Sequence, residues 1–416
     1  MHAIEKILAR AAGLPQVSAG DIVTARVDFA EINDLYLQTL YSFAEMGGKN
    51  VWDSERLAFV FDHYAPSPTI QAAANQRKMR QFAQEQNLLY HFDVNAGVCH
   101  QVMPEAGVVL PGELILATDS HTTTHGAFGA FGTGVGATDM ATVMISGEIW
   151  LRTPEIVEIC LEGQPPAGVY AKDVILHVLG HIRADGAIYQ ALDFTGSYVE
   201  QLGVAGRMVL CNMAVEMGAK TAYIQPNDEV LAYVRQRAKR PYQPLTSDAD
   251  FCYVRSHMFD VSTLEPQVTA PGGVDNVLPL SAVRGQRIDQ GLIGTCTGGR
   301  SEDIRVAAEL LRNRQIPPYI RLLIAPASAQ IMAECLVAGY IADLMAAGAT
   351  LVSPGCGPCL GAHGGVLAPG EVCISASNRN FPGRMGSAEA QIYLASPAAV
   401  AVSALKGCIT DPRDYL

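Results

Sequence analysis

Three cysteines in the last third of the chain lie in glycine-rich segments. Cys296 stands in GTCTGGR, and Cys356 and Cys359 form a Cys-x-x-Cys pair in PGCGPCLG. Thiolates hold iron–sulfur clusters, and glycine-rich loops expose backbone amides that can donate hydrogen bonds to the sulfurs. Three thiolates leave one iron of a cubane cluster without a protein ligand, and an open metal position is what Lewis-acid catalysis needs. The spacing therefore predicts a three-thiolate site.

Other interpretations of these cysteines stay open on spacing alone. CGPC is also a thioredoxin-type redox sequence, although here SPG precedes it in place of an aromatic residue. A structural zinc site has four ligands, and His363 could be the fourth. Simple burial is the third alternative, which the flanking Gly and Pro residues disfavour because they mark turns. The remaining cysteines are predicted to be buried apolar residues: Cys99, Cys160, Cys211, Cys252, Cys335, Cys373 and Cys408.

Carboxylates and histidines follow two predicted strands at the point where each strand ends. The two groups are Asp62-His63 after LAFVF and Asp119-Ser120-His121 after ELILAT. A carboxylate beside an imidazole fixes its tautomer or raises its basicity, as acid–base catalysis requires. His100 in GVCHQV and Glu216 in AVEMGAK are further candidates. For Glu216 a structural salt bridge is the alternative, because a buried carboxylate is costly unless it is paired.

Two arginines near the C-terminus are candidates for binding an anionic substrate. Arg379 and Arg384 lie in SNRNFPGR, beside asparagines and a glycine. A guanidinium binds a carboxylate through paired, charge-assisted hydrogen bonds. The pair indicates a substrate with two or three carboxylates, with ordinary surface arginines as the alternative.

The elements that position these residues are predicted to be strands alternating with helices. A chain of 416 residues with 49% apolar and 17% charged residues exceeds one core of roughly 250–300 residues. We expect an α/β fold of three α/β/α lobes with mostly parallel sheets, over residues 1–152, 153–270 and 271–416. Ligands bind beyond the carboxyl ends of such strands, so the candidate residues should line one central cleft. Ser301 is predicted to cap the helix that follows the Cys296 turn.

Charge and hydropathy exclude several classes. The net charge of −12 disfavours a general nucleic-acid binder, and the basic run 235–240 (RQRAKR) is interpreted as a solvated helix end within a peripheral stretch, 226–248. No segment approaches the ~20 apolar residues of a membrane span, and the start is too charged for a signal peptide, so we expect a cytoplasmic protein. The glycines at 132, 134 and 136 imitate a dinucleotide fingerprint but lack its last glycine, which disfavours nucleotide binding.

These motifs together resemble the aconitase superfamily, in the branch of 3-isopropylmalate dehydratase and homoaconitase large subunits. The resemblance is carried by FDHYAPSP, GVCHQV, ATDSHTTTHGAFGAFGTGVGATD, NMAVEMGAK, GTCTGGR, PGCGPCLG and SNRNFPGRMG. It implies a [4Fe-4S] cluster on Cys296, Cys356 and Cys359, with one iron free of protein ligands. It implies catalytic roles for Asp62, His63, His100, Asp119, His121 and Glu216. It implies substrate-binding or cluster-proximal roles for Ser120, Asn212, Asn378, Arg379 and Arg384.

The same resemblance implies a hydro-lyase that isomerises a hydroxy di- or tricarboxylic acid by dehydration and rehydration. Isopropylmalate is the expected substrate, and homocitrate, dimethylmalate, methylmalate and citrate are alternatives. A swivelling fourth domain found in single-chain relatives is not recognised in the sequence, so we expect a separate small subunit, in a heterodimer or heterotetramer. The sequence has Gly298 where the family has Asn, which predicts an altered cluster environment. A non-catalytic RNA-binding regulator is the alternative from another class, and the net charge disfavours it.

Overall fold

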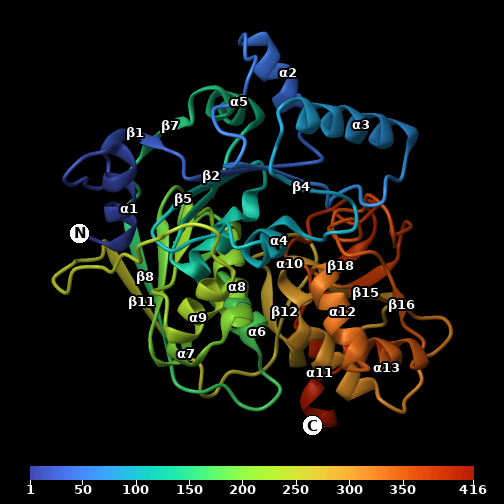
Figure 1. Cartoon of the computed structure of the whole chain (residues 1–416). Coiled ribbons are helices and arrows are strands. Elements are labelled where there is room, and N and C mark those ends of the chain that lie inside the picture. Colours follow the sequence, from blue (N-terminus) through green and yellow to red (C-terminus); the bar gives the residue numbers. More distant parts are fainter.

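The computed structural model describes residues 1–416, and its first large sheet carries the Asp-His motifs (Figure 1). Five parallel strands lie in the order β4-β3-β2-β5-β6. They are β2 (Phe29–Asn33), β3 (Leu57–Val60), β4 (Tyr90–Phe92), β5 (Leu114–Ala117) and β6 (Phe131–Gly134). The accompanying helices are α1 (Ala3–Ala12), α2 (Leu37–Glu45), α3 (Ile70–Glu85), α4 (Cys99–Glu105), η1 (Ser120–Phe128) and α5 (Ala137–Ser146). The predicted strands LAFVF and ELILAT are confirmed as β3 and β5.

The second sheet is also parallel and carries four strands in the order β10-β9-β8-β11. They are β8 (Ile156–Glu162), β9 (Ala191–Thr195), β10 (Thr221–Tyr223) and β11 (Arg255–Asp260). Its helices are α6 (Ala171–Ile182), α7 (Ser197–Gln201), α8 (Val204–Met213), η2 (Ala214–Met217) and α9 (Asp228–Arg237). A short antiparallel pair, β1 (Ile22–Arg26) with β7 (Glu148–Arg152), lies beside the first sheet.

The third sheet has seven strands in the order β13-β12-β18-β17-β14-β15-β16. They are β12 (Gln267–Thr269), β13 (Val277–Pro279), β14 (Gln290–Gly294), β15 (Arg321–Ala325), β16 (Thr350–Leu351), β17 (Val372–Ser375) and β18 (Gln391–Leu394). Strand β12 pairs antiparallel with both β13 and β18, and the other pairs in this sheet are parallel. The other elements are η3 (Leu280–Val283), α10 (Thr295–Gly298), α11 (Ser301–Leu311), α12 (Ala329–Val337), α13 (Tyr340–Ala346), α14 (Pro397–Lys406) and η4 (Pro412–Tyr415). The mixed α/β architecture with mostly parallel sheets agrees with the prediction.

The hydrophobic cores follow the sheets only in part. One core joins residues of the first sheet, such as Phe29 and Ile115, to residues of the second, such as Ile159 and Leu192. The third sheet has a core of its own around Ile293, Ile324 and Val400. The first two sheets thus share a core, and the third keeps a core of its own, although Val277 of β13 packs against the shared core. The division of the chain at 152 and 270 remains a prediction.

Several local predictions were wrong. The helix predicted through ATVMISGEIWL ends at Ser146, because Gly147 adopts φ +71° and the chain turns into strand β7. The stretch 226–248 contains helix α9, in which Val230 and Val234 are buried, and Arg240 at the end of the basic run pairs with Glu113 instead of facing only solvent. Helix α11 begins at Ser301 itself, because the backbone N–H of Arg300 donates to the Asp303 carboxylate (3.0 Å). Cys252 is exposed, because it lies in irregular chain before β11.

No single helix is long and apolar enough to span a membrane. The bent pair of α12 and α13, which turns through 80°, passes that test only by length and composition.

Candidate functional site

The cysteine side of the site is gathered around one asparagine. Cys296 follows β14, and Cys359 lies in the loop after β16. Asn378 Nδ2 donates to Cys296 Sγ (3.1 Å), and Asn378 Oδ1 lies 3.7 Å from Cys359 Sγ. The same Nδ2 donates to Asn212 Oδ1 (3.1 Å) from helix α8 of the second lobe. Three loops that are distant in sequence therefore meet at the predicted thiol site.

Cys356 connects this thiol group to the Asp-His motif of the first lobe. Its backbone N–H donates to the carbonyl of Asp62 (2.7 Å), and its Sγ lies 3.9 Å from Asp62 Oδ2. One ligand atom each of Asp62, His63 and Cys356 falls within 4.8 Å of the others. The cysteines and the predicted acid–base residues thus lie in contact with each other, as the strand-end argument predicts.

The thiols differ in how easily they ionise. Burial raises the pKa of Cys296 to about 12 and that of Cys356 well above its usual value. Burial also opposes ionisation of Cys359, but Arg384 outweighs it, with Nη2 3.5 Å from the sulfur, and lowers the pKa of that thiol. Three buried thiols with an amide donor and a nearby cation fit a group that takes thiolate ligands, such as the expected [4Fe-4S] cluster.

Asp119 is the centre of the histidine network. Its Oδ1 accepts from His100 Nε2 (2.9 Å) and from the backbone N–H of His121 (2.7 Å), and its Oδ2 lies 3.5 Å from His63 Nε2. His63 Nδ1 in turn lies 2.6 Å from Asp62 Oδ1. Burial lowers the pKa of His63, but the charges of Asp62 and Asp119 outweigh it, so the net pKa is well above the ordinary value. A protonated, hydrogen-bonded His63 can act as an acid.

A second chain of contacts joins the remaining predicted residues. Glu216 Oε1 accepts from His121 Nε2 (2.7 Å) and from Arg379 Nε (2.8 Å). Arg379 Nη2 donates to Ser120 Oγ (3.0 Å). Burial raises the pKa of Glu216, but these two cationic partners outweigh it and the net pKa is lowered. Glu216 therefore forms the salt bridge that was its alternative interpretation, and this salt bridge lies inside the predicted site.

Lys172 was missed by sequence analysis. Its ammonium is buried (2% exposed) and donates to the carbonyls of Ser377 (2.6 Å) and Ala376 (3.1 Å) and to Thr297 Oγ1 (3.2 Å). It forms no ion pair with a carboxylate, and burial lowers its pKa to about 8. Lys172 thus ties the Cys296 turn to the loop of the predicted substrate arginines. A lysine inside the apolar helix AKDVILHVLGHI was the available signal.

Two carboxyl groups behind the Asp-His motif were also missed. Asp34 accepts hydrogen bonds from the backbone N–H groups of His63 and Tyr64 (both 2.9 Å) and so positions that turn. Glu31 is buried on β2, and neither of its carboxyl oxygens has a hydrogen-bond partner. Burial, with the nearby Asp62 and Asp119 charges, raises the pKa of Glu31 well above its ordinary value. A carboxylate inside the apolar strand FAEIN was the signal here.

Close packing explains why a glycine occupies position 298, where the family has Asn. A Cβ atom added at Gly298 would lie 2.4 Å from Ala376 Cβ and 3.0 Å from the Ala376 carbonyl oxygen. The Ala376 carbonyl also accepts hydrogen bonds from Lys172 and Thr297, so it cannot move freely. Gly298 therefore allows the Cys296 turn to pack closely on the end of β17.

Comparison with known proteins decides the family. Residues 23–407 match the model of the Aconitase family (aconitate hydratase). The chain belongs to the aconitase family. A probable methanogen homoaconitase large subunit from Methanothermobacter thermautotrophicus is 50% identical over 99% of this chain and 98% of its own length. A 3-isopropylmalate dehydratase large subunit from Methanopyrus kandleri is 49% identical over 99% of both chains.

A solved structure supports the aconitase-like fold. The crystal structure of Thermococcus kodakaraensis aconitase X in its holo form aligns with a TM-score of 0.51 at 14% identity. The alignment covers 91% of this chain and 89% of that one. The predicted family and fold class are therefore confirmed, and the roles of individual aconitase-type residues remain predictions.

Proposed function

We propose that this chain is the large, cluster-bearing subunit of a hydro-lyase that isomerises a hydroxy di- or tricarboxylic acid, with 3-isopropylmalate dehydratase as the favoured activity. The observation that carries the proposal is the Asp62–Cys356 contact, which joins the thiol group and the histidine network in one site. Relatives of 42–49% identity named 3-isopropylmalate dehydratase large subunits support it. Homoaconitase is the second candidate, because a relative at 50% identity bears that name.

Cys296, Cys356 and Cys359 would hold the [4Fe-4S] cluster. When bound, the cluster supplies an iron without a protein ligand that acts as a Lewis acid toward a hydroxyl and a carboxylate. Asn378 donates to Cys296 Sγ and Arg384 lies against Cys359 Sγ, and both contacts favour the thiolate form of the ligands.

The arginines bind the substrate and the histidines transfer protons. Arg379 and Arg384 bind substrate carboxylates and stabilise the negative charge that develops when the proton α to a carboxylate is removed. His63 or His100, both held by Asp119, gives a proton to the departing hydroxyl. Glu216 fixes Arg379 and His121 relative to each other through one oxygen atom.

We further propose that a small subunit completes the site. The relatives are named large subunits, which supports a partner chain. This partner would supply the base that removes the α-proton and the surface that recognises the substrate's side group.

The decisive experiment co-expresses the chain with the small-subunit gene from the same genome and reconstitutes the complex anaerobically with iron and sulfide. We expect a cluster spectrum and dehydration of 2-isopropylmalate in a panel with homocitrate, 2,3-dimethylmalate and citrate. Preferred turnover of homocitrate would select the second candidate. Absence of a cluster spectrum with all three cysteines intact would overturn the proposal.

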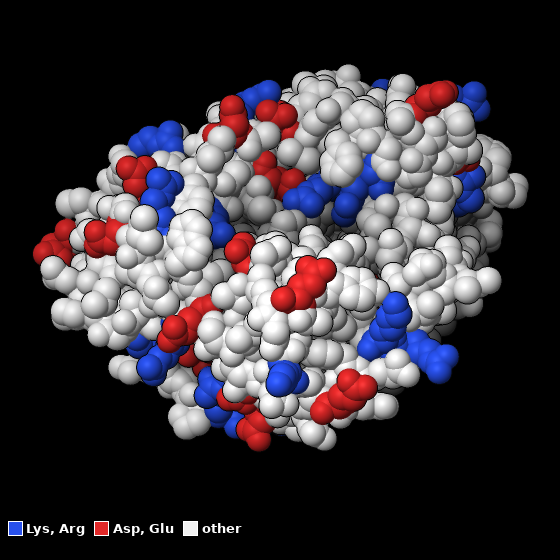
Figure 2. All heavy atoms as spheres, turned by 90° about the horizontal axis from the view of Figure 1, so that it is seen from above, with Lys and Arg blue, Asp and Glu red and all other residues white.

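Two alternatives have their own outcomes in the same preparation. Thioredoxin-like exchange predicts a reversible Cys356–Cys359 disulfide and reductase activity that persists in Cys296→Ser. An RNA-binding regulator predicts salt-dependent RNA binding by the cluster-free chain. On the face shown in Figure 2, basic and acidic side chains are interspersed around a hollow, without a continuous basic surface, which disfavours that alternative.

A further inference from the structure

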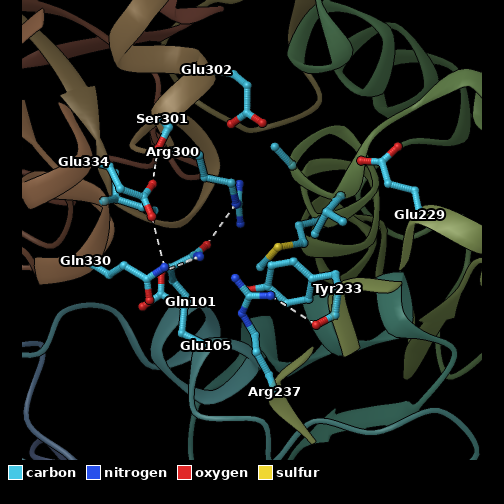
Figure 3. A pocket seen from close by; sticks show the side chains of 14 residues that line it. Gln101, Glu105, Glu229, Tyr233, Arg237, Arg300, Ser301, Glu302, Gln330 and Glu334 are labelled. Carbon is cyan, nitrogen blue, oxygen red and sulfur yellow. Dashed lines mark hydrogen bonds between the residues drawn. The ribbon is translucent and has the colours of Figure 1, made fainter. Parts of the chain in front are cut away.

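A separate cavity of about 280 Å³ lies where residues of all three lobes meet. Its lining comes from α4, α8, α9, the start of α11 and α12 (Figure 3). None of the proposed cluster ligands, acid–base residues or substrate arginines lines it. The proposed reaction therefore does not account for this cavity.

The cavity contains a buried cation without a carboxylate partner. Arg300 is 3% exposed, and its Nε donates to Gln101 Oε1 (3.2 Å), but Nη1 and Nη2 have no hydrogen-bond partner. Arg300 forms no ion pair with a carboxylate, and Figure 3 shows its guanidinium directed into the open space. A guanidinium stays charged, and leaving it buried and unpaired is strongly destabilising. The two free nitrogens present the fork that binds one carboxylate.

Carboxylates surround the rest of the cavity. Glu105, Glu229, Glu302 and Glu334 line it, against two cations, Arg237 and Arg300. Glu334 already accepts from Ser301 and Gln330, and Glu105 accepts from Gln101 and Ser328. Glu229 is exposed and no side-chain donor contacts it. A simple anion would meet four negative charges here, and a simple cation would leave Arg300 unpaired, so a ligand that carries both charges fits better.

The same cavity has an apolar part. Met208 is buried on α8 and Ile331 is buried on α12, and Val204, Ala205 and Tyr233 complete this part of the lining. The volume is below the 300–1,000 Å³ typical of drug-sized ligands, so a small molecule is indicated.

We propose that this cavity binds a free α-amino acid with an aliphatic side chain. Its carboxylate pairs with Arg300, its ammonium lies among the glutamates with Glu229 as the available partner, and its side chain packs against Met208 and Ile331. The ligand class follows from the three kinds of surface that the cavity combines. This inference does not depend on the proposed hydro-lyase activity.

The test measures binding to the full chain, purified anaerobically, by titration calorimetry and thermal shift. L-Leucine is the probe, with 4-methylpentanoate, which lacks the ammonium, and isopentylamine, which lacks the carboxylate, as matched compounds. We expect saturable binding of leucine and weaker binding of both analogues by at least about tenfold, because each loses one charge-assisted hydrogen bond set. Glycine should also bind about tenfold more weakly, because it buries no side chain.

Variants locate the site. Arg300→Gln should weaken leucine binding by about 100-fold, since it removes one partner of a buried charge pair. Arg305→Gln is the matched control, because Arg305 pairs with Glu309 outside the cavity on the same helix. If Arg300→Gln does not fold, the exposed Glu229→Gln should still weaken leucine binding by about tenfold. Undiminished binding in the folded Arg300→Gln variant, equal affinity for 4-methylpentanoate, or no binding to the folded wild-type chain would overturn the proposal.

Discussion

The two halves of the site differ in how far the protein alone satisfies them. On the histidine side, His63, His100 and His121 each contact a carboxylate within 3 Å, and Asp119 lies within 3.5 Å of all three. On the cysteine side, two thiols are held protonated by burial, and the Lys172 ammonium has no carboxylate partner. The first half is organised by its own ion pairs. The second half contains groups that gain a partner when a negatively charged thiolate cluster is bound.

This difference predicts which parts of the chain depend on the bound cluster for their stability. Groups that are already paired should keep their geometry in the cluster-free chain, because breaking a buried pair costs about 3–5 kcal/mol. Groups that are buried without a counter-charge should destabilise the cluster-free chain and become favourable only when the thiolates form. Loss of the cluster should therefore loosen the Cys296 and Cys356 loops more than the Asp-His turns.

The largest effect is expected from Cys356→Ala, which removes a proposed ligand. The reconstituted complex should lose its cluster spectrum and its dehydratase activity, while the histidine side stays ordered. Cys252→Ala is the matched control, because Cys252 is exposed and outside the site. Iron and sulfide content and the visible spectrum check the result. A normal cluster in Cys356→Ala would contradict the assignment of this ligand.

Asp62→Asn should break the histidine half instead. We expect a loss of stability of about 3–5 kcal/mol, because His63 remains buried without its closest carboxylate. His63 has a raised pKa in the folded state, so the stabilisation by Asp62 is fully present below pH ~6.5 and is lost as the pH rises through the folded pKa. Denaturation at several pH values and NMR titration of the His63 ring test this. A loss of stability that does not depend on pH would show that the ion pair is not its cause.

Some residues of the site can be predicted from the sequence and others cannot, and the difference lies in their local sequence context. His63, His121, Cys296, Cys356 and Arg379 were predicted because each follows a strand in a polar or glycine-rich segment, and parallel strands bring such ends together. His100, which lies in α4, was predicted from its sequence motif. Lys172 and Glu31 were not predicted, because each is a single charged residue within an otherwise apolar helix or strand. Their importance comes from tertiary burial, which no local pattern reports. The two wrong boundaries, at Gly147 and Ser301, were set by a left-handed glycine and by a carboxylate that accepts from the Arg300 amide.

Lys172→Met is expected to have opposite effects on the cluster-free chain and on the cluster-loaded complex. In the cluster-free chain the variant should be more stable at pH 7 by about 3 kcal/mol, because folding lowers the pKa of Lys172 from 10.5 to about 8 and the buried ammonium carries that cost. Between pH 8 and 10.5 the unfolded wild-type chain binds more protons than the folded one, so wild-type stability rises in this window. The difference in stability between the variant and wild type should therefore be smaller by about 1 kcal/mol at pH 9 than at pH 7.

The loaded complex should respond to Lys172→Met in the opposite direction. Without the ammonium the thiolates lose a nearby positive charge, so the cluster should be lost faster and its reduction potential should fall. Denaturation of the cluster-free chain and voltammetry of the loaded complex give the two measurements. Lys172→Arg is the control that keeps the charge. A variant that is less stable in both states would show that Lys172 acts only through its hydrogen bonds to the Ala376 and Ser377 carbonyls.

Glu31→Gln is expected to have the smallest effect at pH 4, where the carboxyl group is neutral in the folded chain, because burial and the nearby Asp62 and Asp119 charges raise its pKa well above the ordinary value. The amide has nearly the same shape, so stability at pH 4 should change by no more than about 1 kcal/mol. Glu31 has a raised pKa in the folded state, so wild-type stability falls as the pH rises above ~4.5, while the variant avoids that fall. The stability of the variant relative to wild type should therefore increase between pH 4 and pH 7. An identical pH dependence of unfolding in the two proteins would mean that Glu31 is ionised in the folded chain and has a cationic partner on the histidine side.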